Sequence, residues 1–472
     1  MNGLRKVIEE VGSRSPSDVI RVKKSVDPHL EATAIIARLE KEHQFPILVF
    51  ERMKGSEFPA VCNVMAERRR IAWSLGVEEA ELLETVAARE GQRIAPRRVE
   101  DGPVREVILK GKDIDVRRLP ILTHNDRDDA PYITSGIAVS RDAASGKVDL
   151  GLFRNRLIDE RHIGLYYSWG KQIQFLHRRA EEKGEPLPVA IVLGAHPALY
   201  LASQGLASVA AGDDEYEIAS GLLGEPVELV RCETIDLEVP ADAEIVLEGE
   251  LLPNRREKEG PFGEFTGYYG QIVERPVMRL SAITHRRGAY YQTIASGLAE
   301  HVLLALPARE AALLRELRKV VPTVRSVHFP TEAAGLAIYI SMEKVNEGDA
   351  KNVLLFILGR DTILKMAVVV DDDVDIRNSR EVNWAIATRV HGERDILLAP
   401  GARGTRLDPT AQDITRLSRD GALVTKIGID ATKPIGYGYE WPERLTNRLA
   451  DQIDLDAILP SPEKTLLASE KP

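Results

Sequence analysis

Two glutamates, Glu259 and Glu264, lie five residues apart in the stretch KEGPFGEFTGYYG at residues 258–270. Pro261 fixes its own φ and lacks an N–H donor, and the glycines beside it allow unusual backbone angles. The stretch therefore predicts a defined turn that can direct both carboxylates into one cavity. Burial by the neighbouring aromatic rings would raise a carboxyl pKa, so that one glutamate donates a proton. The alternative is a surface hairpin with two solvated acids.

Arg154 is a basic residue that can partner these acids. It lies in the β-rich stretch DLGLFRNRLID, residues 149–159, next to Phe153. A guanidinium buried there needs carboxylate partners, and it can also clamp a substrate carboxylate through two parallel hydrogen bonds. The alternative is an ordinary surface ion pair.

Other kinds of site have no motif in this sequence. It has no GxGxxG at a strand-to-helix turn, no GxxxxGK[ST], no GxSxG and no HxxxH. Cys62 and Cys232 form no CxxC pair for zinc and are too few for a disulfide framework. His162, His177 and His196 are expected to be structural.

Charge and hydropathy exclude two classes of partner. A net charge of -10 argues against nucleic acid, and the basic run ERRR at residues 67–70 is expected on a solvated helix face. The sequence has no apolar run of about 18 residues and no signal-peptide pattern, so we expect no membrane partner and a cytoplasmic protein.

The 472 residues exceed what one core usually serves, so two or three domains are expected. Residues 1–105 mix helical patterns, such as LRKVIEEVG, with the strand pattern FPILVFERM. Residues 106–305 hold many short alternating runs, typical of a barrel or sandwich, interrupted by helical patterns such as GKQIQFLHRRAEEKG. Residues 306–472 alternate strand and helix patterns, which indicates a second α/β domain.

Several stretches together resemble the UbiD family of decarboxylases. EGPFGEFTGYY resembles the family signature, in which two glutamates flank Pro-Phe-Gly, and DLGLFR at residues 149–154 resembles an Asn-x-Gly-x-(aromatic)-Arg motif. Residues 214–240 resemble the family's Ser-Glu-Tyr helix and Cys-Glu-Thr strand, and VVVDDDVDI, NWAIATRV and TKIGIDATKP resemble C-terminal stretches. The resemblance runs over most of the chain, and the motifs follow the family order.

The resemblance implies an α/β multidomain fold: an N-terminal α/β domain (1–105), a central split β-barrel of the flavin-reductase type (106–305) and a C-terminal α/β oligomerisation domain (306–472). It implies a carboxy-lyase that uses prenylated FMN for reversible, non-oxidative decarboxylation of an aromatic, heteroaromatic or α,β-unsaturated carboxylic acid. The implied partners are the acid substrate, further copies of the chain in a homodimer or hexamer, and a flavin prenyltransferase that supplies the cofactor.

The resemblance also assigns residues. Glu264 becomes the acid that protonates the reacting carbon, and Glu259 and Arg154 become its ion-pair partners. The implied substrate pocket includes Phe265, Tyr437 and Trp169. The implied cofactor contacts are Thr134, Asp149, Gly151, Leu152, Arg154, Glu215 and Lys426.

The metal site matches the family only in part. Members hold Mn²⁺ or Mg²⁺ at the cofactor phosphate through Asn, His and Glu, with K⁺ nearby. Asp149 and Glu215 occupy two of these positions as oxygen ligands, but Trp169 or Lys171 falls where the His is expected. Three alternatives stay open: two protein ligands with water and phosphate, Lys171 as the phosphate partner, or a degraded site.

Two other functions are alternatives. The missing His allows a non-catalytic or assembly subunit of a multi-subunit carboxylase that keeps the fold. Paired carboxylates also serve glycosidases, although an aromatic content of 5% is low for a sugar-binding platform.

Overall fold

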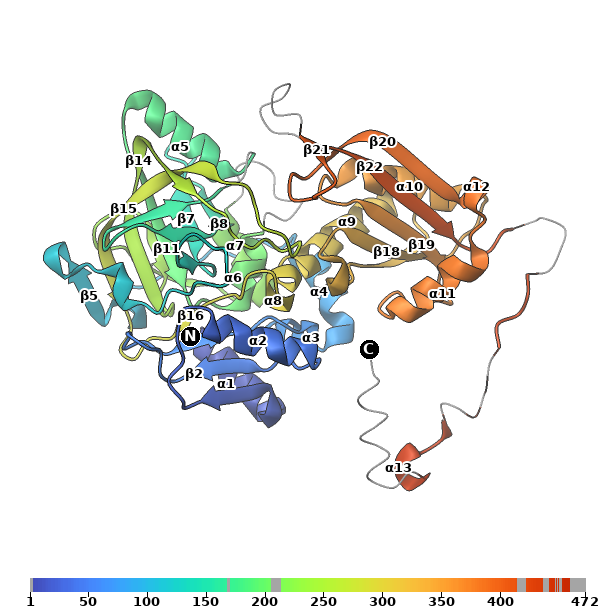
Figure 1. Cartoon of the computed structure of the whole chain (residues 1–472), viewed down its shortest axis with the longest axis horizontal. Helices are drawn as coiled ribbons and strands as arrows, with labels where there is room; N and C mark the ends of the chain where they lie inside the picture. The colour runs from blue at the N-terminus through green and yellow to red at the C-terminus, as the bar shows by residue number, and fades with distance from the viewer. Residues whose placement is uncertain are drawn as a thin grey trace. The chain divides into compact units, whose positions relative to one another are not determined.

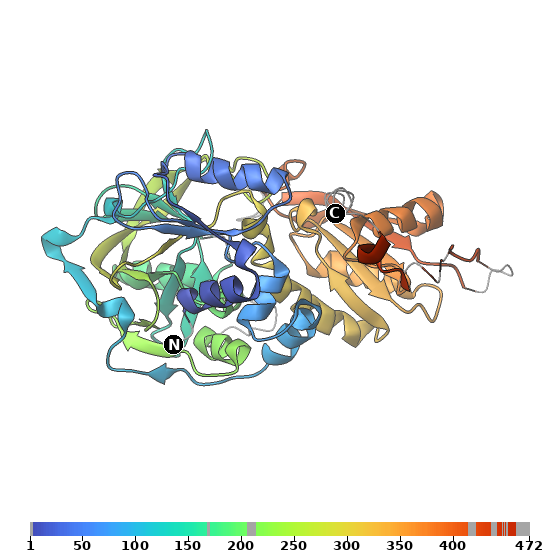
Figure 2. The same ribbon diagram turned by 90° about the horizontal axis from the view of Figure 1, so that it is seen from below.

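The computed structural model describes residues 3–167, 170–204, 214–413, 422–435, 441–445, 447, 449 and 452–458. Figure 1 shows the course of the chain, and Figure 2 shows it turned by 90°. The chain forms two compact units: unit 1 comprises Met1–Glu316, Thr331–Leu336 and Gly401–Val424, and unit 2 comprises Leu317–Pro330, Ala337–Pro400 and Thr425–Pro472. No helix of the described residues has both the length and the apolar character needed to cross a membrane.

The first part of unit 1 is an α/β layer. Its sheet has the strand order β1-β2-β3-β16, with the strands β1 (Val19–Val22), β2 (Ile47–Phe50), β3 (Ala60–Cys62) and β16 (Tyr291–Gln292). Its helices are α1 (Leu4–Arg14), α2 (Glu31–Lys41), α3 (Arg68–Ser74) and α4 (Leu82–Arg89). Helices α1 and α2 lie on opposite faces of this sheet (Figures 1 and 2). The expected mixture of helix and strand is confirmed, but the sequence did not predict that β16, from far along the chain, completes this sheet.

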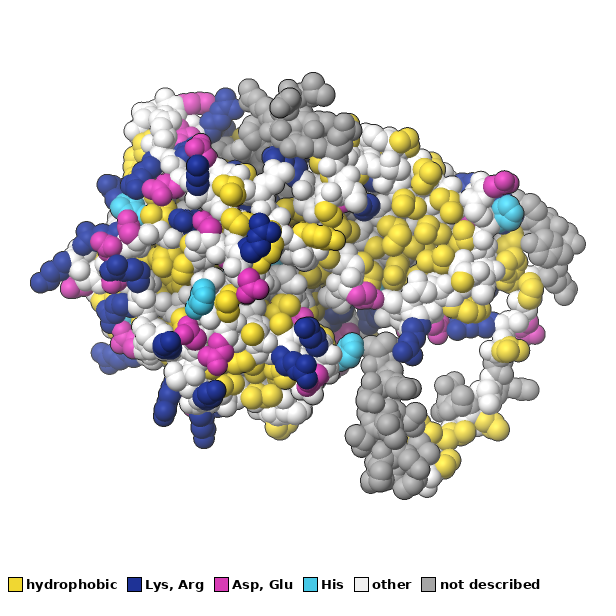
Figure 3. Space-filling model, viewed as in Figure 1, with side chains coloured by type: hydrophobic (Ala, Val, Ile, Leu, Met, Phe, Trp, Pro, Cys, Tyr) yellow, Lys and Arg dark blue, Asp and Glu magenta, His cyan; other side chains and the backbone are white. Residues whose placement is uncertain are grey.

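The prediction of a solvated basic face at residues 67–70 is wrong for Arg70. This side chain is 1% exposed, and its Nη2 donates to the carbonyl oxygens of Phe45 at 2.6 Å and Asn63 at 2.9 Å. Arg68 in the same run forms an ion pair with Glu310 at 2.5 Å. These two arginines therefore connect packed segments, because a buried guanidinium needs acceptors. On the face shown in Figure 3, Lys and Arg side chains are interspersed with Asp and Glu over unit 1.

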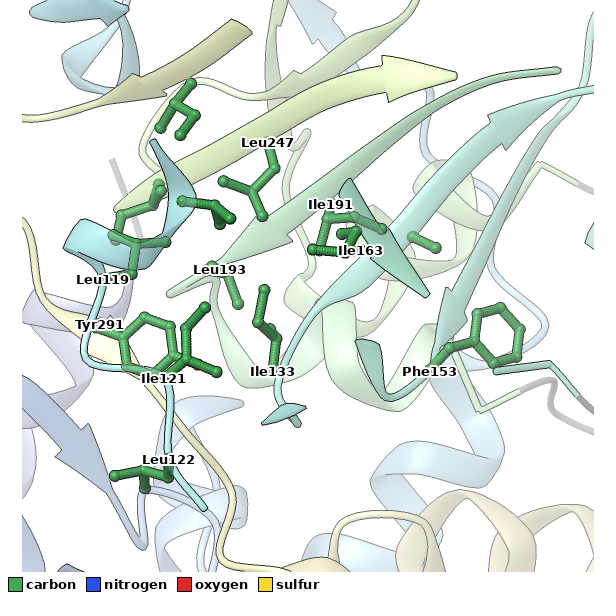
Figure 4. Packing of buried hydrophobic residues seen from close by; sticks show 14 of the residues in the cluster. Leu119, Ile121, Leu122, Ile133, Phe153, Ile163, Ile191, Leu193, Leu247 and Tyr291 are labelled. Carbon is green, nitrogen blue, oxygen red and sulfur yellow. The ribbon is translucent and has the colours of Figure 1, made fainter. Parts of the chain in front are cut away.

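A large antiparallel sheet forms the rest of unit 1. Its strand order is β6-β9-β10-β15-β14-β11-β7-β8, and β5 also pairs with β15. The strands are β5 (Val107–Lys110), β6 (Tyr132–Ile133), β7 (Ile137–Arg141), β8 (Val148–Leu152), β9 (Asn155–Leu157), β10 (His162–Leu165), β11 (Leu187–Leu193), β14 (Ile245–Glu259) and β15 (Val273–His285). Buried apolar side chains from several strands, including Ile163, Ile191 and Leu247, pack into one interior (Figure 4). The expected succession of many strands is confirmed, but β14 with 15 residues and β15 with 13 residues are long rather than short.

Helices and a small sheet accompany these strands. The small sheet has the order β13-β12-β4, formed by β13 (Glu238–Pro240), β12 (Glu228–Arg231) and β4 (Arg97–Arg98). The helices are α5 (Gln172–Lys183), α6 (Pro197–Ala202), α7 (Glu215–Leu223), α8 (Ala299–Leu303) and α9 (Leu306–Val320). The helical pattern GKQIQFLHRRAEEKG corresponds to α5, and the helix implied by the family resemblance at residues 214–240 corresponds to α7. Short 3₁₀ helices lie at Pro16–Asp18, Glu79–Glu81, Pro103–Arg105, Gly111–Asp113, Val116–Arg118 and Thr331–Ala333.

A mixed sheet with the order β17-β18-β19-β22-β20 belongs mostly to unit 2, although Gly401–Val424 of unit 1 includes β21 and parts of β20 and β22. Its strands are β17 (Val324–His328), β18 (Ala337–Met342), β19 (Met366–Asp371), β20 (Ile396–Gly404), β21 (Gln412–Asp413) and β22 (Ala422–Ala431), and its helices are α10 (Asp349–Arg360), α11 (Ser379–Arg389), α12 (Gly392–Asp395) and α13 (Leu455–Ile458). Strands β18, β19 and β22 are parallel, and α10 and α11 follow β18 and β19 in the chain. This is the alternation expected for a second α/β domain. The domain boundaries at 105/106 and 305/306 stay a prediction.

Candidate active site

The glutamate-rich stretch is the loop between the two long strands β14 and β15. Glu259 is the last residue of β14 and pairs with Val273, the first residue of β15. The loop folds back on itself: the Glu264 N–H donates to the Tyr268 carbonyl and the Gly270 N–H donates to the Phe262 carbonyl, both at 2.9 Å. The prediction of a turn rather than a helix is confirmed. The hairpin thereby fixes the backbone that carries both acids.

Two glycines allow this conformation. Gly260 has a φ of +99°, which other residues rarely adopt. At Gly270, a Cβ atom would lie 2.8 Å from the Glu264 Oε1, so a larger residue would displace that carboxyl group. Two residues from outside the loop secure it. The Gly263 N–H donates to the Asp128 carboxylate at 3.0 Å, and the Gly260 N–H donates to the Tyr132 hydroxyl at 3.2 Å.

Arg154 lies between β8 and β9 and joins the two acids. Its Nε and Nη2 donate to Glu259 at 2.6 and 3.1 Å, and its Nη1 donates to the Glu264 Oε1 at 2.6 Å. The side chains of Arg154, Glu259 and Glu264 are only 10%, 2% and 8% exposed. The alternatives of a solvated hairpin and a surface arginine are therefore wrong.

Aromatic rings cover the guanidinium of Arg154. Its Cζ lies 3.8 Å from the ring centre of Tyr166 and 4.6 Å from that of Phe262. The Arg154 guanidinium donates hydrogen bonds to carboxylates along its edge and stacks on aromatic rings. The Arg154 side chain therefore has little freedom to rotate. A second guanidinium, that of Arg275 on β15, lies 4.2 Å from the Tyr166 ring centre.

Burial and charge separate the roles of these groups. Burial raises the pKa of Glu264, and the opposing effect of Arg154 does not cancel it. Glu264 therefore keeps its proton to a higher pH than an ordinary glutamate does. For Arg154, burial disfavours the charge, but Glu264 and Glu259 outweigh it and raise its pKa. The arrangement combines a permanent cation with an acid that can carry a transferable proton.

A second acidic pair lies at β8 and the start of α7. Burial raises the pKa of Asp149 to about 6, against hydrogen bonds from Ser140 and the Ile173 amide and the charge of Lys171. Burial and the nearby Asp149 raise the pKa of Glu215, whose carboxylate accepts a hydrogen bond from the Leu150 N–H. Within the described residues, no cluster of three Asp, Glu, His or Cys side chains suited to a metal ion is formed.

The chemistry of this pair fits a cation. The buried Glu215 and the half-buried Asp149 lie close enough that Asp149 raises the pKa of Glu215, so a shared positive charge would stabilise both ionised groups. Hard divalent ions prefer such oxygen ligands. A cation here would take its remaining ligands from water or phosphate. Lys171, at the N-terminal end of α5, acts electrostatically on both carboxylates.

Other predicted residues lie along the same strands. Gly151 and Leu152 belong to β8, directly after Asp149. The Thr134 Oγ1 accepts a hydrogen bond from the Ile294 N–H at 3.1 Å and lies 3.1 Å from the Thr293 hydroxyl. The ring of Phe265 packs edge-on against His301, with ring centres 6.2 Å apart.

One buried amide near Arg154 fits a polar cofactor. Asn155, the next residue, is 0% exposed, and neither its amide nitrogen nor its amide oxygen has a partner within the described part of the chain. A Cβ atom on Gly136 would lie 3.0 Å from the Asn155 Oδ1. Buried amides are normally hydrogen-bonded, so this group calls for a ligand or water.

Three predicted residues do not join this cluster. Lys426 lies on β22, is 1% exposed and donates through Nζ to the carbonyl oxygens of Leu358 at 2.8 Å and Asp361 at 2.5 Å. Because its ammonium is used inside the packing of unit 2, we withdraw it from the proposed cofactor contacts. Trp169 and Tyr437 lie outside the described residues.

Two features of the site were not predicted from the sequence: the contact of Tyr166 with Arg154, and the presence of His301. Tyr166 could have been found from the β9–β10 hairpin, since the pairing of Leu165 with Asn155 brings Tyr166 opposite Arg154. His301 had no local signal. Burial, assisted by Arg154, lowers its pKa to about 4, and its Nδ1 accepts from the Gly297 N–H at 3.0 Å. It is therefore a neutral imidazole near the guanidinium.

Models of one protein family match three successive parts of the chain. They are described as the N-terminal, Rift-related and C-terminal domains of 3-octaprenyl-4-hydroxybenzoate carboxy-lyase, UbiD, and they match residues 13–90, 97–299 and 302–431. Among curated relatives, anhydromevalonate phosphate decarboxylase of Methanothermobacter thermautotrophicus is 35% identical, over 92% of this chain and 97% of its own. The enzyme of the same name from Methanosarcina mazei is 36% identical, over 88% and 93%.

Solved structures show the same likeness. The UbiD-class enzyme HmfF from Pelotomaculum thermopropionicum, solved with FMN, is 40% identical with a TM-score of 0.90, covering 97% of this chain and all of its own. The 3,4-dihydroxybenzoic acid decarboxylase AroY of Klebsiella pneumoniae is 27% identical with a TM-score of 0.86, covering 96% and 99%. The expected family and α/β multidomain fold are confirmed, and the glycosidase alternative is wrong. The chain belongs to the UbiD family and is a carboxy-lyase of the UbiD class.

Proposed function

We propose that this protein uses prenylated FMN to decarboxylate, reversibly and without net oxidation, an aromatic, heteroaromatic or α,β-unsaturated carboxylic acid. The observation that carries the proposal is the bridge from Arg154 to Glu259 and Glu264, all three buried. The family resemblance assigns these three residues to catalysis, which supports placing the decarboxylation at this bridge.

Glu264 is the proton donor in this proposal. The bond between the substrate carbon and its carboxylate breaks, CO₂ leaves, and a proton from the Glu264 carboxyl group forms the new C–H bond. The carboxylate left on Glu264 is stabilised by the Arg154 Nη1 at 2.6 Å until it regains a proton from water. In the carboxylation direction, Glu264 accepts the proton instead.

Glu259 has a different task. It accepts two hydrogen bonds from Arg154, whereas Glu264 accepts one. The two-point contact fixes the guanidinium plane. Glu264 can therefore change its protonation while the ion pair beside it stays in place.

The cofactor site is proposed on β8 and around it. Polar and backbone contacts to the cofactor would come from Thr134, Gly151, Leu152 and the Asn155 amide. Asp149 and Glu215 would supply oxygen ligands for a Mn²⁺ or Mg²⁺ ion at the phosphate, and K⁺ would be a second ion. HmfF has been solved with FMN and, in an evolved dimeric form, with prFMN. When bound, prenylated FMN would supply the electron sink for loss of CO₂.

The relatives suggest substrates and partners. Their names give anhydromevalonate phosphate and 3,4-dihydroxybenzoic acid, and a third solved relative is a vanillic acid decarboxylase. We propose an acid of this broad kind, with Phe265 in its pocket. We also propose self-association into a homodimer or hexamer and a flavin prenyltransferase as the cofactor source.

The test is co-expression with a flavin prenyltransferase. The purified protein should carry a flavin visible in its absorption spectrum and mass spectrum. It should release CO₂ from at least one acid in a panel that includes anhydromevalonate phosphate, 3,4-dihydroxybenzoate and vanillate. Absence of flavin, despite a folded chain, would instead favour the non-catalytic subunit. Bound flavin with undiminished turnover in Glu264→Gln would refute the assigned proton donor.

A further inference from the structure

A column of alternating rings and guanidinium groups stands beside the proton donor. Phe262 and Tyr166 flank Arg154, with ring centres 4.6 and 3.8 Å from its Cζ, and the Arg275 Cζ lies 4.2 Å from the Tyr166 ring centre. A guanidinium at such a height covers the face of a phenol ring. Two of them cannot share one face, so Arg154 and Arg275 stack on opposite faces of Tyr166.

The surroundings of Arg275 are energetically unfavourable for a cation. It has no carboxylate within ion-pair distance among the described residues, and its buried Nε has no hydrogen-bond partner there. Its Nη1 makes only a long contact, 3.5 Å, to the Glu274 carbonyl. Arg256, on the neighbouring strand, is instead paired with Glu181 at 2.7 Å. A partly buried, unpaired cation beside an active site calls for a functional explanation.

We propose that Arg275 is a positioning residue for proton transfer: it holds Tyr166 flat against Arg154 and offsets the negative charge that forms on Glu264 when the proton leaves. This inference rests on the proposed role of Glu264 as the acid. Arg275 itself need not touch substrate or cofactor.

The local charges support this role. The charged groups that act on Glu264 are Arg154, Glu259 and Arg275. Once Glu264 has lost its proton, Arg154 alone would face two carboxylates, and Arg275 brings this group to neutrality. Consistent with that, Arg275 lowers the pKa of Glu264, although burial remains the larger and opposite influence.

Two further titratable groups flank the same loop, and neither is among the charged groups that act on Glu264. His301 on α8 has its pKa lowered to about 4 by burial and is neutral. The Asp128 carboxylate accepts hydrogen bonds from the amides of His124, Asn125 and Gly263. Burial nevertheless raises the pKa of Asp128 against these hydrogen bonds.

The experiment titrates Glu264 directly in the holoenzyme. The infrared band of its protonated carboxyl group is isolated by subtracting the spectrum of Glu264→Gln, and the pH at which the band disappears is recorded. In Arg275→Gln we expect this pH to rise by about half a unit or more, because a nearby cation favours the ionised acid. Arg275→Lys keeps the charge and should stay near the wild type. Arg256→Gln, which removes a cation already paired with Glu181, is the matched control and should also stay near it.

The stack has its own test. Tyr166→Leu removes the ring and should shift the same titration in the direction of Arg275→Gln, whereas Tyr166→Phe keeps the ring and should shift it less. An unchanged titration in Arg275→Gln, or an equal shift in Arg256→Gln, would overturn the proposal. If Arg275→Gln and Arg275→Lys both lose flavin or folding while Arg256→Gln does not, Arg275 has a structural role. This outcome would also overturn the proposal. If Glu264→Gln retains turnover, the proposed function fails whatever Arg275 does, so the two failures are distinguishable.

Discussion

Glu264 is joined to Arg154 by a single hydrogen bond, from Nη1 to Oε1 at 2.6 Å, in a setting where both side chains are nearly excluded from water. One contact, rather than two, suits an acid that must change its protonation state. Glu264→Gln keeps the shape and the hydrogen bond but has no acidic proton. We expect turnover to fall by about 10²–10⁴-fold, with flavin content unchanged. Steady-state rates and the flavin absorption of the same preparations measure both, and Glu274→Gln, at an exposed residue of β15, is the control.

The pH dependence of turnover should reflect the same acid. Burial raises the pKa of Glu264, and the protonated form is the one that acts in decarboxylation. Activity should therefore persist above the usual glutamate range and fall as the pH rises through this raised pKa. A profile of kcat against pH, with flavin occupancy checked at each point, measures the fall. A rate that increases steadily with pH would contradict an acid role.

Arg154→Lys tests whether charge alone is sufficient. A lysine ammonium is a point charge that cannot donate along a planar edge to Glu259 and stack on two rings at once. We expect turnover to fall by about 10²–10³-fold, although the net charge is kept. Arg156→Lys is the matched control, since Arg156 follows on β9 and pairs with Asp129 rather than with Glu259 or Glu264. Equal effects of the two variants would argue against a specific role for Arg154.

Glu215→Gln should weaken cofactor retention. The amide oxygen can still accept the Leu150 N–H, but the pair with Asp149 loses the negative charge that a divalent ion needs. We expect several-fold lower flavin occupancy and bound metal, measured by absorbance and elemental analysis after gel filtration. Glu217→Gln, in the same first turn of α7, is the control. Unchanged occupancy of both would remove Glu215 from the proposed anchor.

His196 should make stability depend on acid conditions. Its Nδ1 accepts the Ala198 N–H at the start of α6, and burial lowers its pKa from 6.5 to about 3. The unfolded chain binds the additional proton between these values, so the free energy of unfolding falls as the pH drops below about 6.5. His196→Asn keeps a capping oxygen without this titration. Between pH 6.5 and 5, the wild type should lose about 2 kcal/mol more than the variant. Urea unfolding at each pH measures the difference, and parallel losses would contradict it.

Local patterns in the sequence predicted most of the elements. Helix α1 shows why: its buried residues recur at helical spacing, which depends only on the chain itself. Proline and glycine likewise made the loop at residues 260–272 predictable as a turn. By contrast, the parallel pairing of β16 with β3 joins segments far apart in the sequence, so no pattern among neighbouring residues predicts it.

Arg70 and Lys426 show the opposite error. Both are charged residues that sequence reasoning assigned to solvent or to a ligand, and both are 1% exposed. Their partners are backbone carbonyl oxygens of distant segments, such as Phe45 for Arg70 and Leu358 for Lys426. Every residue has such a carbonyl, so nothing in the sequence marks the ones that will be acceptors.

The sequence by itself determined the family, the hairpin that carries two glutamates and the identity of the arginine between them. Only the tertiary structure decided that Arg154 is enclosed by Tyr166 and Phe262, that Arg275 lies beyond Tyr166, and that Glu264 is buried deeply enough to keep a proton. The reason is physical. Turn and strand preferences act between neighbours along the chain, whereas burial, stacking and pKa depend on which distant residues fold around a group.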